Sequence, residues 1–139
     1  MYPNTFYRVS VKAYVTNEKG QVFVVRENDK KGGSWWGLPG GGLDHGETPE
    51  ACLKREIQEE LGIKEVIINE ISYTKSFYMD RKDAWLIWIV YRAKINTDRF
   101  VVADGVTNAK FIDIEDIESS EDMFEQAIVE VSHFLRKQE

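Results

Sequence analysis

The chain has 139 residues, of which 42% are hydrophobic and 30% are charged, and its formal net charge is -6. This length suits a single domain spanning residues 1–139, and the apolar stretches spread along the chain exclude a disordered protein. The acidic balance disfavours a binding surface for long nucleic acid or for an anionic membrane, because both require clustered cations.

Signals of the cellular compartment are few but agree with one another. Cys52 is the only cysteine, so no intrachain disulfide can form. The N-terminal stretch MYPNTFYRVS lacks the basic and apolar regions of a secretory signal. No apolar run reaches the roughly 20 residues that a membrane helix needs. We therefore expect a cytoplasmic protein, either a monomer or a homodimer.

The first part of the chain predicts two strands. Residues 6–16 alternate between apolar and polar side chains, and this period of two is typical of a strand. The turn NEKG and the apolar run QVFVVRE follow, so we expect the second run to pair with the first as a hairpin. The next segment, which includes WWGLPGGGLDHGE, is rich in glycine and predicts a loop with short extended pieces.

A helix is predicted after this glycine-rich loop. Thr48 suits the N-cap, Pro49 suits the first helical position, and Gly62 suits the left-handed position just beyond the last turn. Apolar residues recur every four positions and predict a buried stripe, formed by Leu53, Ile57 and Leu61.

The second half predicts three strands and another helix. KEVIINEISYTKSFYM and DAWLIWIVYRAKI are long β-rich runs joined by a turn near residues 80–83, and TNAKFIDI is a further short strand. Both faces of the second run are apolar, so we expect Trp88 in the core. A last helix is predicted to begin near Ser120 and to end near Arg136. Two helices and a mixed β-sheet predict an α/β sandwich with the sheet between the helices.

The predicted first helix carries three acids on one face. Glu56 lies three and four positions before Glu59 and Glu60, so their carboxylates share one patch and repel one another. A solvated helix face and a metal site both explain this pattern. Divalent Mg²⁺ or Mn²⁺ prefers carboxylate oxygens, so a bound ion would turn the repulsion into coordination.

The residues around these acids favour the metal site. The stretch Gly41–Ile63 fits the pattern G-x5-E-x7-R-E-U-x-E-E-x-G-U, where U is aliphatic, and WGLPGG precedes it. This pattern is the Nudix box, and the chain resembles the Nudix hydrolase family, whose members include MutT-like proteins. The resemblance implies a Nudix-type α/β/α sandwich and hydrolysis of a diphosphate linkage, with Mg²⁺ as cofactor and Mn²⁺ as the alternative.

The resemblance also implies roles for individual residues. It implies metal ligands at Glu47 and the carbonyl of Gly40, in addition to the three acids Glu56, Glu59 and Glu60. Arg55 resembles the arginine that orients these glutamates, and we group it with Glu56 and Glu59 as the catalytic residues. In some relatives the general base is the glutamate that matches Glu56, and in others it comes from a distant loop.

Asp104 is the candidate for such a distant acid. The alternative is that Asp104 is an ordinary turn residue before Gly105. Many relatives carry an acid closer to the position of Asn108, where this chain has an amide. That difference counts against the variant of the mechanism with a distant base.

Three residues are candidates for contact with the substrate. Arg26 ends the second predicted strand, where an arginine in similar proteins often touches phosphate, but a strand-end charge in water is an equal alternative. Arg8 shares one strand face with Lys12 and could also meet an anion. Tyr78 lies roughly where dinucleoside polyphosphate hydrolases carry a tyrosine.

The resemblance leaves several substrates open. The leading interpretation is a pyrophosphohydrolase acting on a small nucleotide, either a nucleoside triphosphate or another nucleoside diphosphate derivative. A nucleotide sugar or a dinucleoside polyphosphate is the first alternative. A non-catalytic nucleotide sensor is the second, although sensors usually lose box glutamates that this chain keeps. An RNA 5′ end is a further possible substrate, but the acidic balance argues against a long RNA track.

Overall fold

The computed structural model of the chain describes residues 6–28, 33–119 and 126–138. The strands and helices follow one another in this order: β1 (Arg8–Tyr14), β2 (Val22–Asn28), β3 (Ser34–Gly37), β4 (Gly40–Gly42), α1 (Pro49–Leu61), β5 (Val66–Met79), the 3-10 turn η1 (Asp80–Lys82), β6 (Ala84–Ile95), β7 (Val106–Ile112), α2 (Ile114–Ser119) and α3 (Gln126–Arg136).

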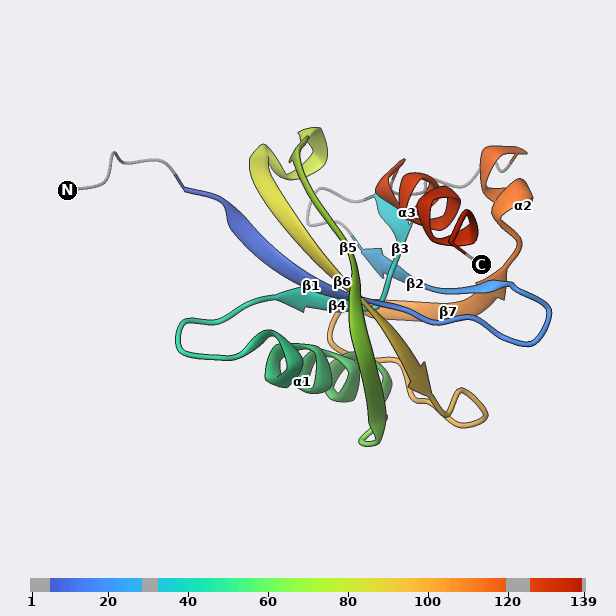
Figure 1. Cartoon of the computed structure of the whole chain (residues 1–139). Helices are drawn as coiled ribbons and strands as arrows, with labels where there is room; N and C mark the ends of the chain where they lie inside the picture. Colours follow the sequence, from blue (N-terminus) through green and yellow to red (C-terminus); the bar gives the residue numbers. More distant parts are fainter. Residues whose placement is uncertain (1–5, 29–32, 120–125, 139) are drawn as a thin grey trace.

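The strands form two sheets that lie between helices. One sheet has the order β4-β1-β6-β5 and is mixed, because β1 and β6 run parallel while the other neighbours are antiparallel. The other sheet is antiparallel, with the order β3-β2-β7. Helix α1 lies on one side of the strands, and α2 and α3 lie on the other (Figure 1). The predicted α/β sandwich is confirmed, with its strands divided between two sheets.

The predicted hairpin of the first two strands is wrong. β1 and β2 belong to different sheets, and near their turn they share only the bridge between Thr16 and Val22 and a hydrogen bond from the Phe23 N–H to the Val15 carbonyl. The two strands diverge because both edges of β1 are already paired, with β4 and with β6. The divergence opens the space between the two sheets in which the candidate site lies.

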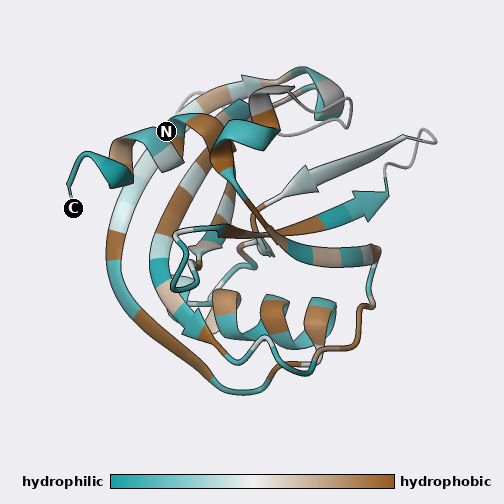
Figure 2. Cartoon of the chain, turned by 90° about the vertical axis from the view of Figure 1, so that its right-hand side faces the viewer, coloured by the Kyte–Doolittle hydropathy of each residue, from teal (hydrophilic) through white to brown (hydrophobic). Residues whose placement is uncertain are grey.

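The core divides into two clusters, one under each helical layer. Leu53, Ile57 and Leu61 of α1 are fully buried against residues that include Phe23, which confirms the predicted stripe. Trp88 is fully buried in the other cluster with residues of α2 and α3, as predicted. Each large apolar side chain that is buried in this way stabilises the fold by about 1.5–3 kcal/mol. Figure 2 shows apolar and polar residues alternating along the strands and around α1.

Both ends of α1 form as predicted. The Thr48 hydroxyl accepts a hydrogen bond from the Ala51 N–H at 3.2 Å, and Pro49 occupies the first helical position. Gly62 ends the helix in the left-handed region, with φ of 68°, and its N–H donates to the Gln58 carbonyl. These caps define where each glutamate lies along the helix.

The remaining elements agree only in part with expectation. The β5–β6 hairpin and β7 are confirmed, whereas α2 was not predicted. The predicted start of the last helix near Ser120 lies outside the described residues, and α3 ends at Arg136. Among the helices in the described ranges, none has the length and apolarity needed to cross a bilayer.

Candidate metal and active site

A cavity of about 190 Å³ lies where the two sheets diverge. Charged side chains from both sheets, α1 and two connecting segments line it. Four of them are acids and three are bases: Glu27, Glu56, Glu60, Asp104, Arg8, Lys12 and Lys82. A cavity with charges of both signs suits a ligand that carries both phosphate oxygens and a divalent cation.

Glycines allow the acids of α1 to approach the sheet. The Gly40 N–H donates to Glu60 Oε1 at 3.0 Å, and Glu60 is only 3% exposed. A Cβ on Gly41 would lie 2.5 Å from the Glu56 carboxyl carbon, and a Cβ on Gly40 would lie 2.0 Å from the Val11 carbonyl oxygen. Residues larger than glycine would therefore displace either the carboxylates or β4.

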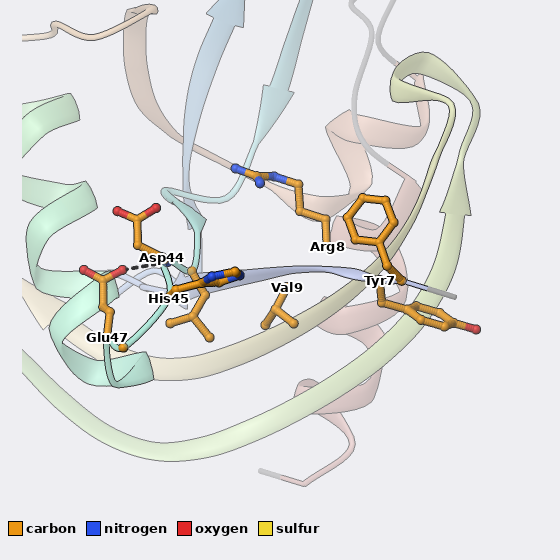
Figure 3. A pocket seen from close by; sticks show the side chains of 9 residues that line it. Tyr7, Arg8, Val9, Asp44, His45 and Glu47 are labelled. Carbon is orange, nitrogen blue, oxygen red and sulfur yellow. Dashed lines mark hydrogen bonds between the residues drawn. The ribbon is translucent and has the colours of Figure 1, made fainter. Parts of the chain in front are cut away.

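Arg55 orients the acids on the outer side of this cavity. Its Nε and Nη2 donate to the two carboxylate oxygens of Glu47 at 2.7 and 2.9 Å. Its Nη1 donates to Glu56 Oε1 at 2.9 Å and to Glu59 Oε2 at 3.2 Å. Hydrogen bonds from Arg55 and from the Asp44 N–H lower the pKa of Glu47 to about 2. The hydrogen bond between Asp44 and Glu47 is drawn in Figure 3. Glu47 is therefore ionised and engaged with Arg55.

Three carboxylates meet in a group that could hold a metal ion. Oxygens of Glu56, Glu59 and Asp104 all lie within 4.8 Å of one another. The loop that carries Asp104 is held against the end of α1, since the Ala103 N–H donates to the Glu60 carbonyl and the Val101 N–H donates to the Leu61 carbonyl. Hard oxygen donors of this kind fit Mg²⁺ or Mn²⁺.

The sequence-predicted metal ligands therefore occupy different places. Glu56 and Glu59 lie together with Asp104, the predicted distant acid. Glu60 lies deeper, bonded to the Gly40 N–H, and Glu47 is paired with Arg55. The carbonyl of Gly40, the predicted backbone ligand, belongs to a residue that lines the same cavity.

Burial governs the protonation of the two inner acids. It raises the pKa of Glu60, against the opposing effects of the Lys12 charge and the Gly40 N–H. It also raises the pKa of Glu56, against the opposing effect of the Arg55 guanidinium. A divalent cation at these carboxylates would favour their ionised forms.

The structure brings only one of the three predicted substrate residues to the cavity. Arg8 lines it, and it also lines a neighbouring cavity of about 400 Å³ bordered by Asp44, His45 and Glu47 (Figure 3). Arg26 does not line the cavity between the sheets. Its guanidinium donates to Ser34 Oγ at 2.7 and 2.9 Å instead.

Tyr78 also lies apart from this cavity. Its hydroxyl donates to Asp83, and its ring packs 5.5 Å from the Trp85 ring. Because side chains alternate along a strand, Tyr78 lies on the opposite face of β5 from Phe77, which packs on the core residue Trp88.

Two charged residues that line the cavity are not predicted from the sequence. Glu27 follows Arg26 on β2, and strand alternation turns it to the other face. Lys82 comes from the η1 turn between β5 and β6. Nothing local in the sequence connects that turn with the box helix, so only the folded chain reveals it.

Comparison with known proteins agrees with the fold and the box. The model of the NUDIX domain matches residues 6–133. The RNA pyrophosphohydrolase of Pseudoalteromonas translucida is 36% identical over 106 residues, which are 76% of this chain and 55% of that protein. The chain thus spans little more than half the length of this curated relative.

Solved structures agree over nearly the whole chain. The MutT protein from Methanosarcina mazei Go1 has a TM-score of 0.80 at 22% identity, covering 99% of both chains. A NUDIX hydrolase from Nitrosomonas europaea has a TM-score of 0.81 at 17% identity, covering 96% of this chain and 90% of that one. At such identities these likenesses concern the fold alone. Because the family model matches most of its length, this chain belongs to the NUDIX domain family.

Proposed function

We propose that the chain is a pyrophosphohydrolase that depends on a divalent metal and cleaves a diphosphate linkage in a nucleoside triphosphate or another small nucleoside diphosphate derivative. One observation carries this proposal above all. Oxygens of Glu56, Glu59 and Asp104 lie within 4.8 Å of one another, and two of these residues line a cavity that also holds three cationic side chains.

Glu56, Glu59 and Asp104 would hold the ion, with Mg²⁺ preferred and Mn²⁺ as an alternative. When bound, the ion supplies charge neutralisation for the diphosphate and activates water for attack on phosphorus. Arg55 keeps Glu56 and Glu59 directed toward that place through its Nη1 hydrogen bonds. Arg8 and Lys82 provide positive charge for phosphate oxygens that the ion does not reach.

Glu56 is the proposed general base for the attacking water. Its carboxylate lines the cavity and is held by a hydrogen bond from Arg55 Nη1, so in its ionised form it can accept a proton there. Asp104 is the alternative base, because it approaches the same point from the β7 side. We infer that the two acids can be told apart by the pH dependence of kcat in the variants Glu56→Gln and Asp104→Asn.

An RNA 5′-triphosphate is a second candidate substrate. It presents the same phosphate linkage as a nucleoside triphosphate, and the relative from Pseudoalteromonas translucida bears the name RNA pyrophosphohydrolase. The net charge of -6 disfavours contact with a long stretch of RNA, so recognition would be confined to the 5′ end. A non-catalytic sensor is disfavoured because Glu56, Glu59 and Glu60 are all retained.

A substrate panel tests the proposal. Nucleoside triphosphates, nucleotide sugars, dinucleoside polyphosphates and a short 5′-triphosphate RNA are incubated with Mg²⁺ or Mn²⁺, and phosphate, pyrophosphate and nucleotide products are separated. We expect metal-dependent turnover of at least one compound and a loss of about a hundredfold in Glu59→Gln. The variant Glu70→Gln, which changes an exposed acid on β5, is the matched control. Turnover that survives in Glu59→Gln, or no turnover of any compound, would contradict the proposal.

A further inference from the structure

Three aromatic rings lie side by side at one end of the sheet that contains β1, β6 and β5. The Trp85 ring on β6 lies 5.9 Å from the ring of Tyr7, which directly precedes β1, and 5.5 Å from the ring of Tyr78 on β5. Each of the three residues is between 40% and 52% exposed. Single exposed apolar residues are ordinary, whereas a contiguous group of them marks a binding surface. The position of these rings therefore calls for a ligand or a partner.

The rings are exposed because α1 covers only part of this face of the sheet. Side chains alternate along a strand, so Tyr7, Val9 and Val11 share one face. Val11 is fully buried in the core cluster that includes the apolar stripe of α1. Val9 is only half-buried and Tyr7 is exposed, so the cover provided by the helix ends between Val11 and Tyr7.

A cavity of about 400 Å³, the Tyr7 pocket, lies where this cover ends. Figure 3 shows Val9 between His45 on one side and Tyr7 on the other. Leu43 adds to the apolar lining, and its N–H donates to the Val9 carbonyl at 2.9 Å, which attaches this loop to β1. Small-molecule sites are concave, mostly apolar and largely pre-formed, with volumes of roughly 300–1,000 Å³. The Tyr7 pocket has these properties.

Arg8 connects the Tyr7 pocket with the cavity between the sheets, because it lines both of them. A Cβ on Gly42 would lie 2.2 Å from Arg8 Nη2, so the guanidinium lies directly against β4. Glu56, one of the proposed metal ligands, approaches the neighbouring residue Gly41 of the same strand. A ligand that extends from the cavity between the sheets into the Tyr7 pocket therefore passes the Arg8 cation.

We propose that the Tyr7 pocket is the subsite for the nucleobase of the substrate: the base stacks on the Tyr7 ring beside Val9 and Leu43, while Arg8 binds a phosphate between the base and the scissile linkage. This inference rests on the proposed function, because it concerns the same substrate. Apolar and aromatic side chains suit a flat, uncharged ring better than a further phosphate. Trp85 contacts Tyr7 without lining the pocket, so it is a positioning residue that holds the Tyr7 ring in place.

The variant Tyr7→Ala tests the subsite with ligands that do or do not carry a base. Steady-state kinetics are measured on the best nucleotide of the substrate panel, together with inhibition by inorganic tripolyphosphate, which has no base. We expect KM for the nucleotide to rise about tenfold and kcat to change less than about threefold, because stacking is lost equally from the bound substrate and the transition state. The inhibition constant of tripolyphosphate should stay the same. Tyr7→Phe keeps the ring and should behave as the wild type.

Phe134→Ala is the matched control. Phe134 is also a partly exposed aromatic residue, and its ring packs 5.0 Å from the Tyr73 ring, but it lies on α3 and does not line the Tyr7 pocket. Its substitution should change neither constant. If KM in Tyr7→Ala equals that of the wild type, or if inhibition by tripolyphosphate weakens as much as KM rises, the inference is overturned while the proposed function stands.

Tryptophan fluorescence tests the pocket without catalysis. Trp85 contacts Tyr7 and is the most exposed of the four tryptophans. AMP, GMP, CMP and UMP are titrated in EDTA into the wild type and into Trp85→Phe. At least one of them should quench the wild type and not Trp85→Phe, whereas tripolyphosphate should quench neither. If no nucleotide gives quenching that depends on Trp85, the inference is overturned, even where Tyr7→Ala does not fold.

This measurement also separates the inference from the proposed function. Quenching that depends on Trp85, in a protein that hydrolyses no compound of the panel, would contradict the proposed function and still support a base-binding pocket.

A second copy of the chain is the alternative occupant, since exposed aromatic residues are also typical of interfaces between proteins. Sedimentation velocity compares the wild type with Tyr7→Ala. A wild-type dimer that dissociates in Tyr7→Ala would overturn the inference, because the rings would then be covered by the partner. A monomer, or a dimer that is the same in both proteins, leaves the pocket open to a nucleotide and supports it.

Discussion

Arg55 and Glu47 form a two-pronged ion pair, with Nε to Oε2 at 2.7 Å and Nη2 to Oε1 at 2.9 Å. The pair leaves Nη1 of the same guanidinium for Glu56 and Glu59. Arg55 therefore connects the loop before α1 to the proposed metal ligands. Its planar guanidinium is required to bind Glu47 through two nitrogens while the third nitrogen binds Glu56 and Glu59.

We predict that Arg55→Lys lowers kcat at least about tenfold while the circular dichroism spectrum stays the same. A lysine keeps the charge, but its single ammonium cannot engage Glu47 on two oxygens and still reach Glu56 and Glu59. Steady-state kinetics on the best substrate of the panel measure the effect. A kcat within a factor of two of the wild type would show that charge alone is sufficient.

We predict that Asp104→Asn weakens metal binding without weakening the metal-free fold. Asp104 adopts a left-handed backbone with φ of 55°, which asparagine tolerates, so the Tm in EDTA should stay within about 2 °C of the wild type. The increase in Tm on addition of Mg²⁺ should shrink, because one of three carboxylates is lost.

Asp83→Asn is the matched control for this measurement. Asp83 also has a left-handed backbone, with φ of 48°, but it lies in the β5–β6 turn and contacts Tyr78. Its substitution should not change the response to Mg²⁺. If Mg²⁺ raises the Tm of Asp104→Asn as much as that of the wild type, Asp104 is an ordinary turn residue and not a metal ligand.

We predict that Arg8→Ala raises KM roughly tenfold, equivalent to about 1.4 kcal/mol of lost binding, with a smaller effect on kcat. Arg8 lines both cavities at the proposed site, so its loss removes positive charge from the phosphate-binding region. Arg26→Ala is the comparison, because Arg26 donates to Ser34 and lies outside the cavity between the sheets. A rise in KM in Arg26→Ala without a rise in Arg8→Ala would favour Arg26 as the residue that contacts phosphate.

We predict that Cys52 does not react with thiol reagents in the native protein at pH 8. The side chain is fully buried, and burial together with the nearby Glu47 charge raises the pKa of its thiol to about 12. A thiol whose pKa is raised stays protonated up to a higher pH, so at pH 8 the reactive thiolate is scarce. Ellman's reagent should label the protein rapidly in guanidinium chloride and slowly without it. Rapid native labelling would contradict this assignment.

The prediction of α1 from the sequence depends only on residues that are close together in the chain. Its caps, its stripe and its acids all lie within a few residues of one another, where helix geometry determines which side chains share a face. The partners of β1 could not be predicted in this way. Strand β6, its parallel neighbour, comes far later in the chain, and a hairpin with the next strand was the more economical expectation.

The same distinction explains why two of the three predicted substrate residues lie outside the cavity between the sheets. The sequence shows that Arg26 is a cation at the end of a strand. The face of the sheet on which its side chain lies depends on how β2 pairs with β3 and β7. Lys12 appeared as one polar member of an alternating strand. Its burial results from the approach of β4 and Trp88, which are distant in sequence. Packing between residues that are distant in the chain produces no periodic pattern of apolar and polar residues, so a single sequence does not reveal it.

The two backbone hydrogen bonds that attach the loop of Asp104 to the end of α1 restrict how this chain can be re-engineered. Surface connections generally accept insertions at small thermodynamic cost. In the part of the β6–β7 connection that is bonded to α1, however, added residues would shift the register of Ala103 on Glu60 and carry the next side chain away from the helix. We therefore expect a peptide tag inserted at residues 96–100 to be compatible with activity, and the same tag at residues 102–105 to yield a folded but inactive protein.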